Sequence, residues 1–222
     1  MTNLLGRLDL SRMSVDLQQA PAVGACSPLA AAIRRLAEIA FCIALLVLTL
    51  PVMLVAAIAI LVEGGGPILF RQVRVGLHGT TFDVLKFRTM RTNAEANGPV
   101  WAALDDPRVT RVGALLRKTR IDELPQLLNV LRGDMSVVGP RPERPHFVEL
   151  LASEIPGYHD RALIKPGITG WAQVQFRYGS SVDDARRKLE YDLYYLRHRS
   201  LLLDLLILVL TVRVVLSLQG AR

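Results

Sequence analysis

The chain has 222 residues, enough for one domain with appendages, and its two cysteines, Cys26 and Cys42, exclude a disulfide framework and favour a reducing compartment. Hydrophobic residues make up 51% and the mean hydropathy is +0.31, which indicates contact with a membrane. The net charge of +7 fits nucleic acid, an anionic lipid surface or phosphorylated substrates, and the apolar segments favour the last two.

The N-terminal part of the chain divides into a polar extension and an apolar segment. Residues 1–28 lack a sustained period, so we expect a mobile extension. Residues 39–62 carry no charge and are long enough to span a bilayer as a helix. Pro51 near the centre, and arginines on both flanks, leave two topologies open: a kinked spanning helix, or a hairpin that returns to the cytoplasmic leaflet.

A β-hairpin is predicted next, with strands at residues 68–75 and 81–87 joined by a glycine-containing turn. Lys86 and Arg88 share a strand face with Phe82 and Val84. The apolar pair would anchor this face while the basic pair reaches the edge of a site. The alternative is an ordinary solvated strand end. Residues 105–113 then predict a turn and the start of a helix.

Acidic, basic and turn residues crowd into residues 117–143. Leucines at helical spacing from Leu124, with Gly133 just beyond them, predict a short helix that begins near Asp122. A helix N-terminus suits carboxylates, phosphates, or both bridged by a cation, so Asp122 and Glu123 are candidate functional groups. Arg141 lies in a rigid turn that suits a phosphate clamp. The alternative is an N-cap beside a solvated basic face.

The C-terminal third combines predicted helices with one glycine-rich loop. A helix is predicted around residues 147–151, and residues 165–170 form a tight loop whose Lys165 and backbone N–H groups could face a phosphate. Residues 171–175 are predicted to be extended. Ser181 opens a helix with a near capping box, and residues 201–218 form a second apolar segment that either spans the membrane or lies on it.

Five motifs occur in the order in which one known family carries them: Lys86-Phe-Arg-Thr-Met90, Asp122-Glu-Leu-Pro-Gln126, Asn129-Val-Leu-Arg-Gly-Asp-Met-Ser136, Gly139-Pro-Arg-Pro142 and Lys165-Pro-Gly-Ile-Thr-Gly-Trp-Ala-Gln-Val174. Over residues 30 to 218 the chain resembles the bacterial sugar transferases, and within them the small monotopic phosphoglycosyl transferases. Within that group it resembles the polyprenyl-phosphate hexose-1-phosphate transferases that initiate exopolysaccharide synthesis.

The resemblance implies an α+β fold with a defined membrane arrangement. Residues 29–63 would form a re-entrant helix–break–helix anchor that turns at Leu50-Pro51. Residues 64–200 would form a cytosolic catalytic domain with a small β-hairpin, and residues 201–222 an interfacial C-terminal helix. The protein would lie in the bacterial inner (cytoplasmic) membrane with its active site facing the cytoplasm.

The resemblance also implies a covalent reaction. Asp122 would attack the β-phosphate of a UDP-sugar and release UMP, and undecaprenyl phosphate would then take the sugar phosphate. Glu123, with Asp122, would hold Mg²⁺, with Mn²⁺ as the alternative ion. The expected substrate-binding residues are Lys86, Arg88, Arg120, Arg141 and Lys165. UDP-glucose or UDP-galactose is favoured, because residues 141–146 and 175–179 look more like the hexose-phosphate branch than the diacetamido-sugar branch.

Two functions of other classes are alternatives to this one. A non-catalytic membrane partner of a polysaccharide assembly and export system would not need Asp122, Glu123, Arg141 and Lys86 together. A nucleic-acid binder is disfavoured because the basic residues are not interleaved with stacking aromatic residues. The expected partners are therefore a UDP-sugar, undecaprenyl phosphate and inner-membrane lipid, with a homodimer left open.

Overall fold

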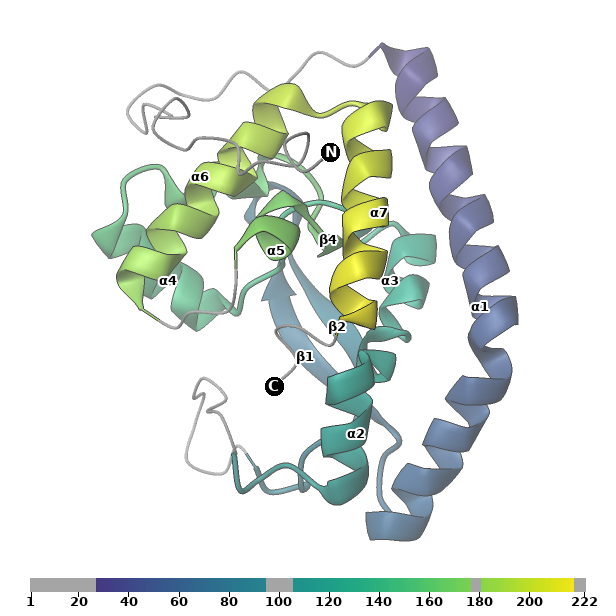
Figure 1. Ribbon diagram of the computed structural model, residues 1–222. Coiled ribbons are helices and arrows are strands. Elements are labelled where there is room, and N and C mark those ends of the chain that lie inside the picture. The colour runs from purple at the N-terminus through teal and green to yellow at the C-terminus, as the bar shows by residue number, and fades with distance from the viewer. Residues whose placement is uncertain (1–26, 95–105, 177–180, 218–222) are drawn as a thin grey trace.

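The structure, a computed structural model, describes residues 27–94, 106–176 and 181–217. It combines helices with two small sheets, which confirms the expected α+β class. The long helix α1 runs along one side of the whole molecule (Figure 1). The helices are α1 (Pro28–Gly64), α2 (Arg111–Thr119), α3 (Gln126–Arg132), α4 (Pro145–Glu154), α5 (Trp171–Gln175), α6 (Val182–His198) and α7 (Leu201–Leu216). The strands are β1 (Leu69–Val75), β2 (Thr81–Phe87), β3 (Ser136–Val138) and β4 (Gly167–Thr169).

Helix α1 is continuous through Pro51, so the expected helix–break–helix is not confirmed. Ser27 caps its first turn by accepting a hydrogen bond from the Ala30 N–H at 3.2 Å. Residues on both sides of Pro51 are buried against the same body: Cys42 before it, Ala56 and Ile60 after it. This packing holds the two halves in one helix, although a proline inside a helix costs roughly 3 kcal/mol in isolation.

The outward face of α1 is apolar and exposed. Val47, Leu48, Val55 and Val62 are each more than two thirds exposed. By length and composition α1 is long and apolar enough to cross a membrane, and no other helix in the described residues meets that test. A large apolar surface of this kind on one helix indicates a lipid-facing element.

The predicted β-hairpin is confirmed. Strands β1 and β2 pair antiparallel from Leu69 opposite Phe87 to Val75 opposite Thr81. The fully buried Asn129 of α3 fastens this hairpin: its side-chain oxygen accepts from the Leu85 N–H at 3.0 Å, and its amide nitrogen donates to the Asp83 carbonyl at 2.7 Å. The hairpin therefore holds a fixed position against α3.

The acidic pair lies one turn before the α-helix that was expected to contain it. Asp122 and Glu123 belong to a 3₁₀ turn, Ile121–Glu123, and α3 begins only at Gln126. The proline ring of Pro125 would clash with the Ile121 carbonyl in an α-helix, so the chain instead uses the tighter Leu124 N–H to Ile121 carbonyl bond of 3.1 Å. The predicted end at Gly133 is confirmed, with φ at 95°.

Strands β3 and β4 form a short parallel pair that the sequence did not predict. Backbone segments approach very closely here, because a Cβ on Gly167 would lie 2.1 Å from the Gly139 nitrogen. The Gly167 N–H donates to the Pro140 carbonyl at 2.9 Å, which ties the turn at residues 139–142 to β4. Glycine at 139 and 167 therefore positions Arg141.

Two of the helices predicted in the C-terminal third are confirmed, whereas the loop expected at residues 165–170 contains strand β4. The predicted helix around residues 147–151 is α4, and the Ser181 capping box opens α6. The predicted extended run at residues 171–175 is wrong, since it forms α5. This turn of helix buries Trp171, which stacks on Tyr194 with ring centroids 6.1 Å apart.

Helix α7 confirms the second apolar segment and packs into the same core as α1. Its buried Asp204 accepts from the Tyr195 hydroxyl at 2.7 Å and pairs with Arg34 of α1 at 2.8 Å. Cys42, Val130, Trp171 and Ile207 belong to one cluster, so α1, α3, α5 and α7 share a core. The division at residues 28, 63 and 200 stays a prediction, and the expected mobile extension lies almost wholly outside the described residues.

Candidate active site

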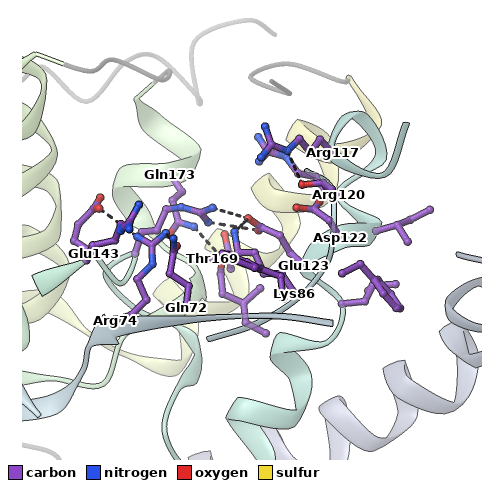
Figure 2. A pocket seen from close by; sticks show the side chains of 18 of the residues that line it. Gln72, Arg74, Lys86, Arg117, Arg120, Asp122, Glu123, Glu143, Thr169 and Gln173 are labelled. Carbon is purple, nitrogen blue, oxygen red and sulfur yellow. Dashed lines mark hydrogen bonds and ion pairs between the residues drawn. The ribbon is translucent and has the colours of Figure 1, made fainter. Parts of the chain in front are cut away.

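A cavity of about 1040 Å³ opens at the centre of the molecule. Its walls come from α1, the β1–β2 hairpin, the turn at Ile121–Glu123, the loop at residues 141–144, β4, α6 and α7. Figure 2 shows charged side chains converging on it from β1, β2, the end of α2, the turn at Ile121–Glu123 and the loop at residues 141–144. The volume is at the upper end of the range for small-molecule sites, which leaves room for more than one reactant.

Glu123 is held between two cations in this cavity (Figure 2). Lys86 Nζ lies 3.0 Å from Glu123 Oε1, and Arg141 reaches both carboxylate oxygens, at 2.5 Å to Oε1 and 3.4 Å to Oε2. Burial alone would raise the pKa of Glu123, but Arg141 and Lys86 hold this pKa well below its usual range. Glu123 is therefore a carboxylate at neutral pH, and it orients both cations.

Asp122 differs from its neighbour in having an unused oxygen. The side chain is buried, and Oδ1 has no hydrogen-bond partner. Burial, and then the adjacent Glu123 charge, raise the pKa of Asp122 to about 6, although Lys86, Arg141 and Arg117 oppose the rise. A desolvated carboxylate with a bare oxygen is a stronger nucleophile than a hydrated one, and at neutral pH most Asp122 side chains are ionised.

Two arginines from α2 and its end stand on the Asp122 side of the cavity (Figure 2). Arg117 Nε donates to the Thr89 hydroxyl at 2.9 Å, which fixes the guanidinium against β2's end. Arg120 adopts a left-handed backbone with φ at 59°, uncommon for a residue other than glycine. This conformation ends α2 and reverses the chain so that Asp122 follows at once.

A second set of charged side chains forms hydrogen bonds with the backbone around Arg141. Arg161 Nη2 donates to the Arg141 carbonyl at 2.9 Å, and its Nε and Nη2 donate to Asp192 Oδ2 at 3.1 and 2.7 Å. Arg74 Nη1 donates to the Pro142 carbonyl at 3.1 Å. The loop that carries Arg141 is therefore fixed from β1, the 3₁₀ turn Tyr158–Leu163 and α6.

The structure brings together most, but not all, of the predicted site residues. Asp122, Glu123, Lys86, Arg120 and Arg141 all line the cavity. Arg88 lines it too, but its Nη2 donates to the Gly65 carbonyl at the end of α1, so its substrate-binding role stays a prediction.

Lys165 is not among the cavity-lining residues. A Cβ on Gly133 would lie 3.6 Å from the Lys165 Nζ, which places this ammonium group at the C-terminal end of α3. A helix C-terminus carries partial negative charge, so this position suits a cation without any substrate. Its predicted substrate contact is untested.

Sequence reasoning missed Arg74, Arg161 and Asp192. Their bonds to each other and to the 141–142 backbone join segments 20 to 68 residues apart, so no local motif contains them. The one available signal was a charged residue on an otherwise apolar helix face: Asp192 shares its face of α6 with the buried Leu189, Tyr195 and Leu196. Such a residue usually has a buried partner.

No group of three His, Cys, Asp or Glu side chains within residues 27–94, 106–176 and 181–217 is placed to enclose a metal ion. Mg²⁺ typically binds through one or two carboxylates together with substrate phosphates, so it does not need such a cage. Asp122 and Glu123 are adjacent, and the bare Asp122 Oδ1 is an available donor. The donor set therefore fits Mg²⁺ that arrives with a phosphorylated substrate.

The combination of a bare carboxylate with surrounding cations suits phosphoryl chemistry. Lys86, Arg117, Arg120 and Arg141 can neutralise phosphate oxygens, while Asp122 can attack phosphorus. Arg141 reaches Glu123 with both terminal nitrogens of its planar guanidinium, and this geometry matches a phosphate group as well as a carboxylate.

Comparisons with known proteins agree with this chemistry. A family profile described as bacterial sugar transferase matches residues 29–218. An Aeromonas hydrophila protein named UDP-N-acetylgalactosamine-undecaprenyl-phosphate N-acetylgalactosaminephosphotransferase is 47% identical over 196 residues, which are 88% of this chain and 46% of that protein. A Caulobacter vibrioides protein named UDP-glucose:undecaprenyl-phosphate glucose-1-phosphate transferase is 43% identical over 190 residues, 85% of this chain and 71% of that protein.

A third relative covers a shorter stretch at higher identity. It is a Bacillus subtilis protein named putative undecaprenyl-phosphate N-acetylgalactosaminyl 1-phosphate transferase, 52% identical over 130 residues, 59% of this chain and 73% of that protein. The chain thus spans less than half of the Aeromonas protein and about three quarters of the other two.

Proposed function

The chain belongs to the bacterial sugar transferase family, and from that premise we propose that it moves a sugar-1-phosphate from a UDP-sugar to undecaprenyl phosphate, releases UMP, and so starts exopolysaccharide repeat-unit synthesis. The observation that carries the proposal is the bare, buried Asp122 Oδ1 beside a Glu123 carboxylate held by Lys86 and Arg141. The relatives' names supply the substrate classes, and the cavity supplies the matching charges.

The proposed reaction has two displacements at one phosphorus atom. In the first, an Asp122 oxygen bonds to the β-phosphorus of the UDP-sugar, the bond from that phosphorus to the bridging oxygen breaks, and UMP leaves. In the second, a phosphate oxygen of undecaprenyl phosphate bonds to the same phosphorus and the bond to Asp122 breaks. The product is a lipid diphosphate sugar, and the carboxylate is regenerated.

Both substrates are polyanions and repel the Asp122 carboxylate, and the cations around Asp122 offset this repulsion. Arg117 and Arg120 lie near this carboxylate (Figure 2), and Lys86 and Arg141 are paired with the adjacent Glu123. When bound at Asp122 and Glu123, Mg²⁺ would supply further neutralisation of phosphate charge. Arg161 keeps Arg141 in place by binding its carbonyl.

The donor sugar is a narrower question. Sequence features favour UDP-glucose or UDP-galactose, while the relatives are named for glucose in one case and N-acetylgalactosamine in two. The panel of donors must therefore include both plain hexoses and N-acetylhexosamines.

We also propose that α1 lies in the cytoplasmic leaflet of the inner membrane without crossing it. Arg35 near its start donates to the Val130 carbonyl at 2.8 Å, and Glu63 near its end accepts from the Val112 N–H at 3.0 Å. These two residues are about 42 Å apart at 1.5 Å per residue, more than the roughly 30 Å hydrocarbon core. A helix crossing the bilayer would pull the charged body into hydrocarbon.

That arrangement predicts that both ends of α1 face the cytoplasm. Single cysteines at Leu29 and Pro67, both exposed, would be introduced after replacement of Cys26 and Cys42. A membrane-impermeant thiol reagent should label both positions in inside-out vesicles and neither in right-side-out vesicles. Labelling of the two positions from opposite sides would show that α1 spans the membrane.

The activity is tested by the nucleotide released when protein in nanodiscs meets Mg²⁺, undecaprenyl phosphate and UDP-glucose, UDP-galactose, UDP-N-acetylglucosamine or UDP-N-acetylgalactosamine. We expect UMP with at least one donor, and no UMP from Asp122→Asn at unchanged melting temperature. Release of UDP would mean glycosyl transfer and would overturn the phosphoryl mechanism. No nucleotide from folded protein across the panel would favour the non-catalytic alternative.

A further inference from the structure

The cavity has a second, apolar arm that the two reactive carboxylates and their cations leave unused. We propose that this arm is the binding slot for the isoprenoid chain of the acceptor: it runs between α1 and α7 and ends at Asp122. The inference rests on the proposed function, because it assigns a place to the lipid substrate of the same reaction.

The two walls of the slot come from the two most apolar helices. Side chains from α1 and α7 line the same cavity as Asp122, although α1 ends at Gly64 and α7 begins only at Leu201. The floor comes from α3, its preceding turn and β4. The lining residues of the slot are Leu45, Thr49 and Val52 from α1, Thr211, Val214 and Val215 from α7, and Leu124, Leu127 and Ile168 beneath them.

The hydroxyl groups in the slot are already satisfied within the protein. Thr49 Oγ donates to the Leu45 carbonyl at 2.7 Å, and the Thr211 hydroxyl donates to the Ile207 carbonyl at 2.7 Å and lies 2.6 Å from the Thr169 hydroxyl. Their methyl groups remain to line the slot. A surface of aliphatic side chains and satisfied hydroxyls suits a hydrocarbon chain and does not suit a sugar or a nucleotide.

The slot is continuous with surfaces that face lipid. Val52 is 45% exposed, and on the same helix Val55 and Leu48 are exposed beyond the slot. On α7, Val209 and Val212 are likewise exposed. A polyprenyl chain dissolved in the leaflet could therefore enter between the helices without crossing water, while its phosphate arrives at the charged end of the cavity.

The cavity also has a polar arm, on the side where Figure 2 draws Gln72 and Arg74. It contains Arg74, Arg144 and Lys188, together with Gln72 and Ser181. This division of charge assigns the water-soluble UDP-sugar to the polar arm and the lipid to the apolar arm. The nucleotide and the lipid chain then occupy separate arms, while the acceptor phosphate oxygen takes the position at phosphorus that UMP has left, as in-line displacement requires.

Two matched pairs of tryptophan variants test the slot from both walls. Val215→Trp on α7 and Val52→Trp on α1 place an indole in the slot, whereas Val212→Trp and Val55→Trp place it on an exposed face of the same helices. All four are assayed in nanodiscs for the KM of undecaprenyl phosphate. We expect the two slot variants to raise this KM about tenfold, as displacement of two buried methylene groups would, and the two exposed variants to stay within about twofold.

A second readout separates the slot from the chemistry. UMP release by excess enzyme in the absence of acceptor reports only the donor half-reaction, and its rate should be equal in wild type and in Val215→Trp. With geranyl phosphate as a short acceptor, the difference in KM between Val215→Trp and Val212→Trp should shrink, because less chain occupies the slot.

Several results would overturn the slot. One is an equal KM for undecaprenyl phosphate within both pairs. Another is a higher KM in all four variants, which would indicate that added tryptophan changes how the protein sits in the membrane. A difference on α7 but not on α1 would contradict a site between the two helices. Failure of the proposed function looks different, because wild type would then release no UMP with any donor.

Discussion

Replacing Arg161 with methionine should lower the free energy of unfolding, by an amount that depends on pH. The guanidinium donates two hydrogen bonds to Asp192 and one to the Tyr158 hydroxyl at 2.8 Å. Asp192 is only 2% exposed. Arg161→Met leaves Asp192 as an uncompensated buried acid, which typically costs about 3–5 kcal/mol. For a chain of this size that corresponds to a fall in melting temperature of roughly 6 to 20 °C.

The pH dependence follows from the sign of the Asp192 shift. Burial raises the pKa of Asp192 in the folded protein, and Arg161 opposes this rise. Without Arg161 the folded-state pKa increases further, so the folded protein binds a proton more tightly than the unfolded chain does. Stability is then greatest at low pH and falls as pH rises above the unfolded value of about 4. The deficit of Arg161→Met relative to wild type should therefore be larger at pH 8 than at pH 5.

The assay is thermal unfolding of detergent-held protein at pH 5 and pH 8, with Arg186→Met as the control. Arg186 lies exposed on α6 and forms a 4.0 Å surface pair with Asp183, so its removal should change the melting temperature little. The double variant Arg161→Met, Asp192→Leu should recover much of the stability. Its rate of UMP release should stay below that of wild type, because the Arg141 carbonyl still lacks its donor. A melting temperature for Arg161→Met within about 2 °C of wild type at both pH values would refute the reasoning.

Three further changes have separate readouts. Lys86→Met should lower the kcat/KM for UMP release by about a hundredfold with little change in melting temperature, because one of the two cations on Glu123 is lost; an unchanged kcat/KM would remove Lys86 from the site. Gly167→Ala should yield little folded protein by size-exclusion chromatography, since its Cβ would lie 2.1 Å from the Gly139 nitrogen; a monodisperse, active variant would contradict that contact. Ser181→Ala should cost about 1 kcal/mol in thermal unfolding by removing the α6 cap, and a loss above about 3 kcal/mol would mean that Ser181 does more than cap.

Local signals in the sequence were sufficient for the hairpin, for α4, for α6 and for the charged run around Asp122. In each case the information lies within a few residues: alternating strands around a glycine turn, a capping box at Ser181, or Gly133 after a leucine run. The candidate carboxylates were therefore identifiable before the fold was known. The difference between them, with Asp122 bare and Glu123 paired twice, could not be identified from the sequence, because it depends on Lys86 and Arg141 from other segments.

The features that differ from expectation depend on packing. Pro51 predicts a break only for an isolated helix, whereas Cys42 and Ile60 bury both halves of α1 against one body. Five residues at Trp171 are too few for a helical period to show, and α5 exists because it turns Trp171 into the core. The role of Arg161 required the three-dimensional structure, since its partner Asp192 lies 31 residues away.

The covalent step at Asp122 is the central claim, and intact-protein mass spectrometry tests it most directly. Wild-type protein would be mixed with Mg²⁺ and the active UDP-sugar in the absence of acceptor, quenched, and compared with Asp122→Asn. We expect wild type to gain the mass of one sugar phosphate, located by peptide mapping on Asp122, and to lose it when undecaprenyl phosphate is added. Turnover of wild type with no such adduct, or an adduct that persists in Asp122→Asn, would contradict the account.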